Sequence, residues 1–175
     1  AHCGSGTAGL ARGKGCDRFL RRWVRRAVEL GLTSALRKRS RPLGVSENDR
    51  HLTLATSASV LERRDPAIYG GLSLSRLEDQ IRAWGGELGC DVVCRQTNSE
   101  GEYVDWCQEL GESADGLIVN PGAWSHYSYA IHDALELFKG PIVEVHLSNV
   151  DEREEWRRNS VIADLVSSRI IGKGP

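Results

Sequence analysis

The segment Glu144-Val-His-Leu-Ser-Asn149 has polar side chains at every second position. Successive side chains of a strand point to opposite faces, so a strand here would place Glu144, His146 and Ser148 on one face. An imidazole beside a carboxylate and a hydroxyl is typical of a general acid or base held in orientation next to a ligand-binding donor. A polar face on an edge strand produces the same pattern, so this segment alone leaves both interpretations open.

A second chemical signal lies in the segment Arg64-Asp-Pro-Ala-Ile-Tyr-Gly-Gly71. The proline and the paired glycines are typical of a lid that carries side chains over a bound ligand. A nearby arginine favours the phenolate, which makes Tyr69 a candidate base. A lone tyrosine is more often a packed side chain with a hydrated hydroxyl, and that alternative stays open.

A third segment, Asn120-Pro-Gly-Ala-Trp-Ser-His126, follows a buried apolar run over residues 116–119. Helical periodicity would place His126, Tyr129 and Asp133 on one side of the helix that follows. The alternative for His126 is a buried imidazole whose polar atoms are satisfied by its neighbours.

The elements that must position these residues alternate along the chain between apolar strand patterns and amphipathic helix patterns. We expect strands over residues 52–60, 91–96, 116–119, 142–147 and 169–171. We expect helices over residues 74–88, over 103–110 behind a capping box at Ser99–Glu102, and over 130–138. Such alternation predicts an α/β fold, a flavodoxin-like doubly wound five-stranded parallel sheet. Ligands of these sheets lie at the carboxyl ends of the strands, where the three polar segments would meet.

The net charge of −1 conceals two parts of opposite sign. Residues 1–45 hold eleven Lys or Arg against two acidic residues, whereas residues 46–175 hold 12 basic and 22 acidic residues. Residues 19–28 have the pattern of a basic amphipathic helix. This pattern fits an organelle transit segment, or a helix packed on the domain or on an anionic surface. A nucleic-acid binder is the least favoured alternative. We therefore expect a basic extension and linker over 1–50 and a catalytic domain over 51–175. The chain has no methionine, which predicts a processed protein or a fragment.

Cysteine usage and hydropathy narrow the class of protein. The five cysteines contain no CxxC pair, which argues against a zinc site and against a disulfide framework. This usage favours a reducing compartment, the cytoplasm, or an organelle if residues 1–45 are a transit segment. No run approaches the roughly 18 apolar residues of a membrane span, so no membrane association is expected.

Taken together, several blocks of the sequence resemble one family, type II 3-dehydroquinate dehydratase. The similarity covers residues 61–174 in family order. The similar blocks are RDPAIYG at 64–70, QTNSEG at 96–101, NPGAWSHYSYAIHDAL at 120–135, EVHLSN at 144–149, REEWR at 153–157, Ser160 and GKG at 172–174.

The resemblance implies a hydro-lyase that converts 3-dehydroquinate to 3-dehydroshikimate without a metal or cofactor, by anti elimination through an enolate. It also implies a homo-oligomer, trimers assembled into a dodecamer, and no nucleic-acid partner is expected. For the catalytic residues it implies Tyr69 as the base, helped by Arg64, and His146 as the acid, held by Glu144. The implied substrate contacts are Ser148 and the backbone near Leu147 for the carboxylate, Asn120, His126 and Arg157 for ring hydroxyls, and Asp133 offered to a neighbouring subunit.

Two departures from the family pattern qualify the resemblance. Ser57 stands where the family has an asparagine that helps to hold a water on the enolate, so we expect reduced activity. The sequence ends at Pro175 where the family continues into a terminal helix, so we expect that helix to be missing and an apolar face to need cover from residues 17–39. The alternative is a truncated or degenerate dehydroquinase-fold protein that acts as a binding module. An FMN-binding flavodoxin is a weaker alternative, because residues 55–59 offer hydroxyls but no glycine for a phosphate loop.

Overall fold

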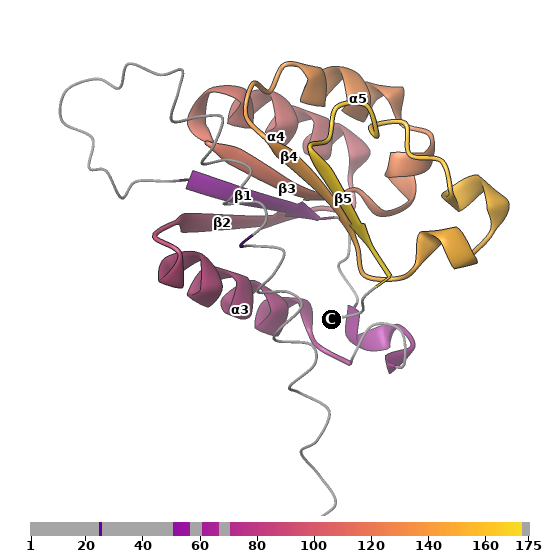
Figure 1. Cartoon of the computed structure of the whole chain (residues 1–175), viewed down its shortest axis with the longest axis horizontal. Coiled ribbons are helices and arrows are strands. Elements are labelled where there is room, and N and C mark those ends of the chain that lie inside the picture. The colour runs from indigo at the N-terminus through magenta and orange to yellow at the C-terminus, as the bar shows by residue number, and fades with distance from the viewer. Residues whose placement is uncertain (1–24, 26–50, 57–60, 67–70, 173–175) are drawn as a thin grey trace, which may run out of the picture.

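The computed structural model describes residue 25 and residues 51–56, 61–66 and 71–172. The expectations about the basic extension, Ser57, Tyr69 and the end of the chain fall outside these residues. Within the described part the chain alternates between strands and helices, as the sequence predicts (Figure 1).

The described strands form one parallel sheet in the order β2-β1-β3-β4-β5, the order expected for a flavodoxin-like sheet. The strands are β1 (His51–Thr56), β2 (Asp91–Gln96), β3 (Gly116–Asn120), β4 (Ile142–His146) and β5 (Ser168–Ile171). All five predicted strands are present; the first is described over His51–Thr56, and residues 57–60 of its predicted range lie outside the described residues.

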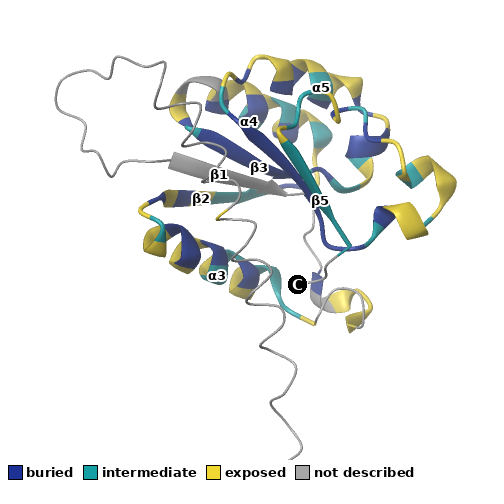
Figure 2. Ribbon diagram, in the orientation of Figure 1, coloured by how far each residue is buried: buried dark blue, intermediate teal, exposed yellow. Residues whose placement is uncertain are grey.

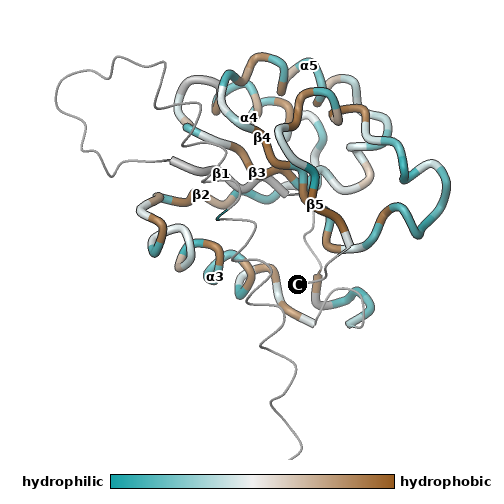
Figure 3. The backbone as a smooth tube through the Cα atoms, in the orientation of Figure 1, coloured by the Kyte–Doolittle hydropathy of each residue, from teal (hydrophilic) through white to brown (hydrophobic). Residues whose placement is uncertain are grey.

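Helices lie on both faces of the sheet (Figure 1). On one face is α3 (Leu74–Glu87), and on the other are α4 (Glu100–Ser113) and α5 (Tyr129–Glu136). The strands alternate their side chains between two buried clusters: Ile118, for example, packs with the α3 side, and Leu117 with the α4 and α5 side. Strand β4 is buried along its whole length and β3 is buried up to Val119 (Figure 2), and both strands are largely hydrophobic (Figure 3).

The capping of α4 differs in one detail from the predicted box. The Ser99 hydroxyl accepts from the Glu102 backbone N–H at 3.4 Å, as expected of an N-cap. The Glu102 carboxylate, however, accepts from the Thr97 hydroxyl, and the Ser99 N–H donates to Thr97 Oγ1 at 2.9 Å. In a capping box the Glu102 carboxylate would accept directly from the Ser99 N–H. Here the Thr97 hydroxyl lies between these two groups and bonds to both.

The third helix begins at Tyr129, close to the start of its expected range of 130–138 and after His126. A 3-10 turn, η2 (Gly122–His126), follows β3, and α5 starts only at Tyr129, where the Ser128 hydroxyl accepts from the Ile131 N–H at 3.2 Å. His126 therefore lies before the helix, and the prediction that it shares a helix side with Tyr129 and Asp133 was wrong. Of the three, His126 is buried and the other two are exposed.

Three further 3-10 turns complete the described elements: η1 (Leu61–Arg63), η3 (Val150–Glu152) and η4 (Glu155–Arg157). Across the described helices, none combines the length and apolar character that a membrane crossing requires.

Candidate active site

Strand β4 carries the polar face predicted from alternation, in the middle of the sheet rather than at its edge. It pairs with β3 on one side and β5 on the other, so the edge-strand interpretation was wrong. Val143 and Val145 pack into the cluster beneath α3, whereas Glu144 and His146 are buried on the other face. Because both polar side chains are withdrawn from water, they must be satisfied by partners.

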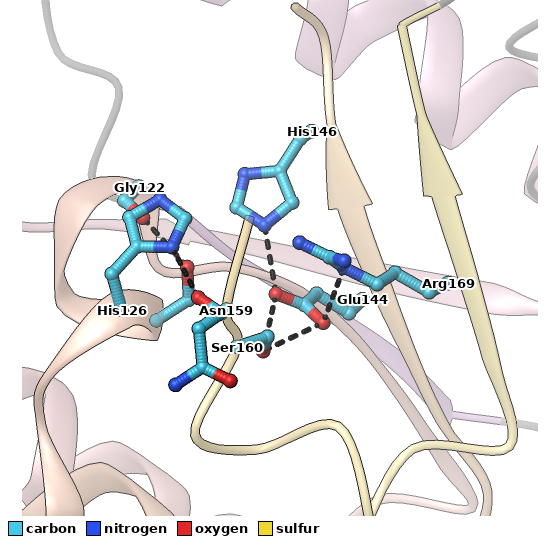
Figure 4. A network of polar contacts seen from close by, with 8 residues as sticks. Gly122, His126, Glu144, His146, Asn159, Ser160 and Arg169 are labelled. Carbon is cyan, nitrogen blue, oxygen red and sulfur yellow. Dashed lines mark hydrogen bonds and ion pairs between the residues drawn. The ribbon is translucent and has the colours of Figure 1, made fainter. Parts of the chain in front are cut away.

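Glu144 is the centre of a buried network that draws on three parts of the chain (Figure 4). Its Oε1 accepts from Nε2 of His146 at 2.7 Å. The Ser160 hydroxyl lies 2.9 and 3.0 Å from the two carboxylate oxygens, and Arg169 Nε on β5 lies 3.2 Å from Oε2. Each carboxylate oxygen thus faces a donor or a cation.

The groups around Glu144 determine its charge. Burial alone would raise its pKa, but the hydrogen bond and charge of His146, the charge of Arg169 and the Ser160 hydroxyl outweigh it, and the pKa is lowered. An ionised carboxylate accepts from Nε2–H, which fixes the proton of neutral His146 on Nε2 and leaves Nδ1 as the nitrogen that gains or loses a proton. Nδ1 points away from Glu144 (Figure 4). The pair is therefore built as an oriented acid or base.

His126 lies beside this pair although it comes from η2. Its ring stacks on that of His146 with centroids 5.8 Å apart and planes inclined by 18° (Figure 4). Its Nδ1 lies 2.7 Å from the Asn159 carbonyl, an acceptor, so Nδ1 carries a proton. Burial is the main reason that the pKa of His126 is lowered, and the adjacent His146 and Arg157 act in the same direction. Neutral His126 thus keeps Nε2 as an acceptor.

A tryptophan and an arginine from η4 close the outer side of His126. The Trp156 ring meets His126 edge to face at 5.2 Å, and the Arg157 guanidinium lies 4.0 Å from the centroid of Trp156. Arg157 is also oriented by Glu154, whose Oε2 lies 2.7 Å from its Nε. A cation is thus held close enough to His126 to lower its pKa.

The end of β4 is fixed by the chain that follows β5. The Gly172 N–H lies 3.2 Å from the His146 carbonyl and 3.1 Å from the Ser148 carbonyl. A Cβ on Gly172 would lie 2.9 Å from the Asn149 Cα, and its φ of 69° is left-handed, so a glycine is required. This approach holds Leu147 and Ser148, both buried, next to the acid–base pair.

Comparison with known proteins shows the family of this chain. The model of the family "Dehydroquinase class II" matches residues 56–175, which include β2 to β5 and every residue of the Glu144 network. The chain belongs to the class II dehydroquinase family.

Named relatives agree with this assignment. A 3-dehydroquinate dehydratase of Pelobacter propionicus is 50% identical over 113 residues, 64% of this chain and 76% of that protein. One from Thermus thermophilus is 46% identical over 118 residues, 67% of this chain and 79% of that protein. The crystal structure of a type II dehydroquinase from Propionibacterium acnes superposes with a TM-score of 0.67 at 38% identity, over 73% of this chain and 88% of that chain.

The fold brings together part of the residue set that the dehydroquinase resemblance implies. His146 contacts both Glu144 and His126, Leu147 and Ser148 follow it directly, and Asn120 lies at the end of β3. Asp133 lies elsewhere, on the exposed side of α5, with its Oδ1 3.6 Å from Nδ1 of His132. Arg64 is exposed just after η1, and the predicted base, Tyr69, and Ser57 lie outside the described residues.

Sequence reasoning missed two members of the Glu144 network, Ser160 and Arg169. Ser160 was noted only as part of the family pattern, without a role. Arg169 had a detectable signal, because a charged residue in an otherwise apolar strand beside a buried carboxylate points to an ion pair. Recognising it required the register that sets Arg169 opposite Glu144.

Proposed function

We propose that this chain is a 3-dehydroquinate dehydratase, a hydro-lyase that converts 3-dehydroquinate to 3-dehydroshikimate. The observation that carries the proposal is the buried His146–Glu144 pair at 2.7 Å, within the residues that match the dehydroquinase family. The relatives cited above carry this activity in their names.

The first step is removal of a proton from the carbon next to the ketone. In this proposal Tyr69 abstracts it as the phenolate, with Arg64 favouring the ionised form, and the electron pair becomes an enolate. A water held by Ser57 donates to the enolate oxygen, less effectively than the amide of the family would, because a hydroxyl lacks the fixed planar geometry of an asparagine.

The second step is loss of the hydroxyl group. The enolate re-forms the ketone and expels the hydroxyl oxygen, which takes the proton from His146 and leaves as water. Glu144 supports this step because it fixes the tautomer of His146 and compensates the imidazolium charge. No metal or cofactor has a part in this mechanism.

The substrate contacts follow the same scheme. Ser148 and the backbone near Leu147 would hold the substrate carboxylate, and Asn120, His126 and Arg157 would hold ring hydroxyls. His126 suits this role because its Nε2, buried and without a hydrogen-bond partner among the described residues, accepts when the ring is neutral.

The assembly and the division of the chain complete the proposal. Asp133 would enter a neighbouring subunit's site in a trimer, with trimers forming a dodecamer. Residues 51–175 would carry the activity, and residues 1–50 would be a separate basic extension in a cytoplasmic or organellar protein.

The deciding experiment is an absorbance assay for the conjugated enone of dehydroshikimate, with purified protein and 3-dehydroquinate. Product formation is expected, and Tyr69→Phe and His146→Gln should each remove most of it. Tyr127→Phe and His132→Gln are matched controls at exposed or half-buried positions and should keep the wild-type rate.

The rival is a dehydroquinase-fold binding module without useful activity, which the departure at Ser57 favours. Absence of product from folded wild-type protein at high concentration would support this rival and contradict the proposed activity. If turnover is present, Ser57→Asn should raise the rate by up to about 100-fold, the usual worth of one donor to a developing oxyanion.

A further inference from the structure

Arg169 is a charged residue in a strand that is otherwise without charge. Its neighbours in β5 are Ser168, Ile170 and Ile171, and the parallel register sets it beside Glu144 on β4. From there its guanidinium reaches the carboxylate on the oxygen that His146 does not use, with Nε 3.2 Å from Oε2 (Figure 4).

The guanidinium relies on this carboxylate for its stability. Its Nε and Nη2 are buried and make no well-formed hydrogen bond to any residue that the structure describes. The contact with Glu144 is therefore mainly one of charge. The Arg169 side chain is only 23% exposed, and a largely buried cation is costly without an opposite charge. Arg169 thus favours the ionised form of Glu144, and Glu144 compensates the charge of Arg169.

The other groups around Glu144 do not replace this cation. Tyr103 of α4 is neutral, because burial raises its pKa well above 10, and His126 of η2 has a lowered pKa. Ser160 is uncharged, and Arg157 of η4 is paired with Glu154. Among the described residues, Arg169 is the permanently charged group in contact with the carboxylate.

Two cations on one carboxylate change the balance of charge in the site. With Arg169 present, neutral His146 leaves a net charge of zero and protonated His146 leaves +1. Without it, the same two states would carry −1 and zero, and the imidazolium would be favoured. Arg169 therefore makes protonated His146 more ready to give up its proton.

We propose that Arg169 is a positioning residue of the acid: it shares the Glu144 carboxylate with His146, keeps that carboxylate ionised and in place, and promotes proton donation by His146. The consequence for catalysis rests on the proposed function, in which the proton passes from His146 to the departing hydroxyl oxygen as the carbon–oxygen bond breaks. The electrostatic part concerns the chain alone.

The test compares Arg169→Met and Arg169→Gln, which both remove the charge, with Arg169→Lys, which keeps it. Arg76→Met, at an exposed position on α3 beneath the other face of the sheet, is the control. The measurement is the pH titration of the His146 ring signals by NMR, assigned by their loss in His146→Gln, together with pH profiles of kcat and KM.

The neutral variants should move the titration midpoint of His146 upward by about one pH unit, as expected when a nearby cation is lost. They should also lower kcat near neutral pH by roughly 3- to 10-fold with little change in KM, because a weaker acid slows the step rather than the binding. The lysine variant and the Arg76 control should stay close to the wild type.

An unchanged midpoint in whichever neutral variant folds, or a lysine variant that behaves like the neutral ones, would overturn the proposal. If the wild type has no dehydratase activity, the proposed function fails, and the NMR titration still decides whether Arg169 acts on His146.

Discussion

Glu144 has one buried carboxylate and three partners, and its charge determines what each partner does. It orients His146, accepts from the Ser160 hydroxyl, which lies near both of its oxygens, and compensates the charge of Arg169. In Glu144→Gln the amide would present N–H groups to one of these donors and leave Arg169 without its counter-charge. We expect kcat to fall by about 100-fold or more, the usual contribution of an acid or base, and the free energy of unfolding to fall by about 3 kcal/mol.

These two effects are measured by the enone assay and by urea unfolding. Glu109→Gln is the matched control, since Glu109 forms an exposed pair with Arg95 at 2.8 Å and such pairs contribute little. A Glu144→Gln protein with the wild-type rate would contradict the role given to the carboxylate.

His126 links the stability of the fold to pH. Its pKa is lowered from 6.5, mainly by burial, so above pH 6.5 its neutral ring contributes fully to stability. As the pH falls through 6.5 towards the folded pKa, the unfolded chain binds the proton first, and stability is lost at up to about 1.4 kcal/mol per pH unit. In urea unfolding at a series of pH values, His126→Asn should show a shallower decline than the wild type.

His132 provides a control of opposite sign. Burial would lower its pKa, but Asp164 and Asp133 outweigh burial and raise it, so its contribution is present below pH 6.5 and is lost as the pH rises through the folded pKa. His132→Asn should therefore lose stability at acidic rather than neutral pH. Equal pH dependence in the two variants would refute the assignment.

The elements show which features could be predicted from local sequence. The parallel sheet and the helices on both of its faces followed from alternation, because each apolar run had to find cover on the sheet. The position of His126 did not follow, because periodicity cannot show where a helix begins. Gly122, with a φ of 63°, and the Ser128 cap break the segment into a 3-10 turn and a helix.

Helix α3 contains adjacent glycines that should respond in opposite ways to the same substitution. A Cβ on Gly85 would lie 2.1 Å from Val92 Cγ2 on β2, whereas a Cβ on Gly86 would meet nothing within 4 Å. Gly85→Ala should cost about 1 to 3 kcal/mol through overpacking. Gly86→Ala should stabilise by about 0.5 to 1 kcal/mol, because alanine restricts the unfolded chain and favours the helix. Thermal unfolding of the two variants measures the difference, and a shift of the same sign in both would contradict the packing of α3 on β2.

Across the whole molecule, the candidate site depends on contacts between distant segments. Ser160 and Arg169 reach Glu144 only because β5 returns beside β4, and the Asn159 carbonyl reaches His126 across 33 residues. The Val161 N–H donates to the Ser125 carbonyl at 2.8 Å and joins the same two segments. Alternation predicts the face of a residue but not its register against another strand, so Glu144 and His146 were predicted and Arg169 was not.

The exposed side of α5 makes the proposed assembly testable. Tyr129 and Leu137 are 69% and 57% exposed, and Asp133 lies between them at helical spacing. Apolar side chains on both sides of a residue expected to enter a neighbouring subunit's site indicate a subunit contact.

Leu137→Glu should therefore reduce the mass of the assembly measured by analytical ultracentrifugation and lower kcat/KM together with it. Val93→Glu, at an exposed apolar position on β2, should change neither. An assembly of unchanged mass in Leu137→Glu would exclude this side of α5 as the contact, and a smaller assembly with full activity would contradict the role proposed for Asp133.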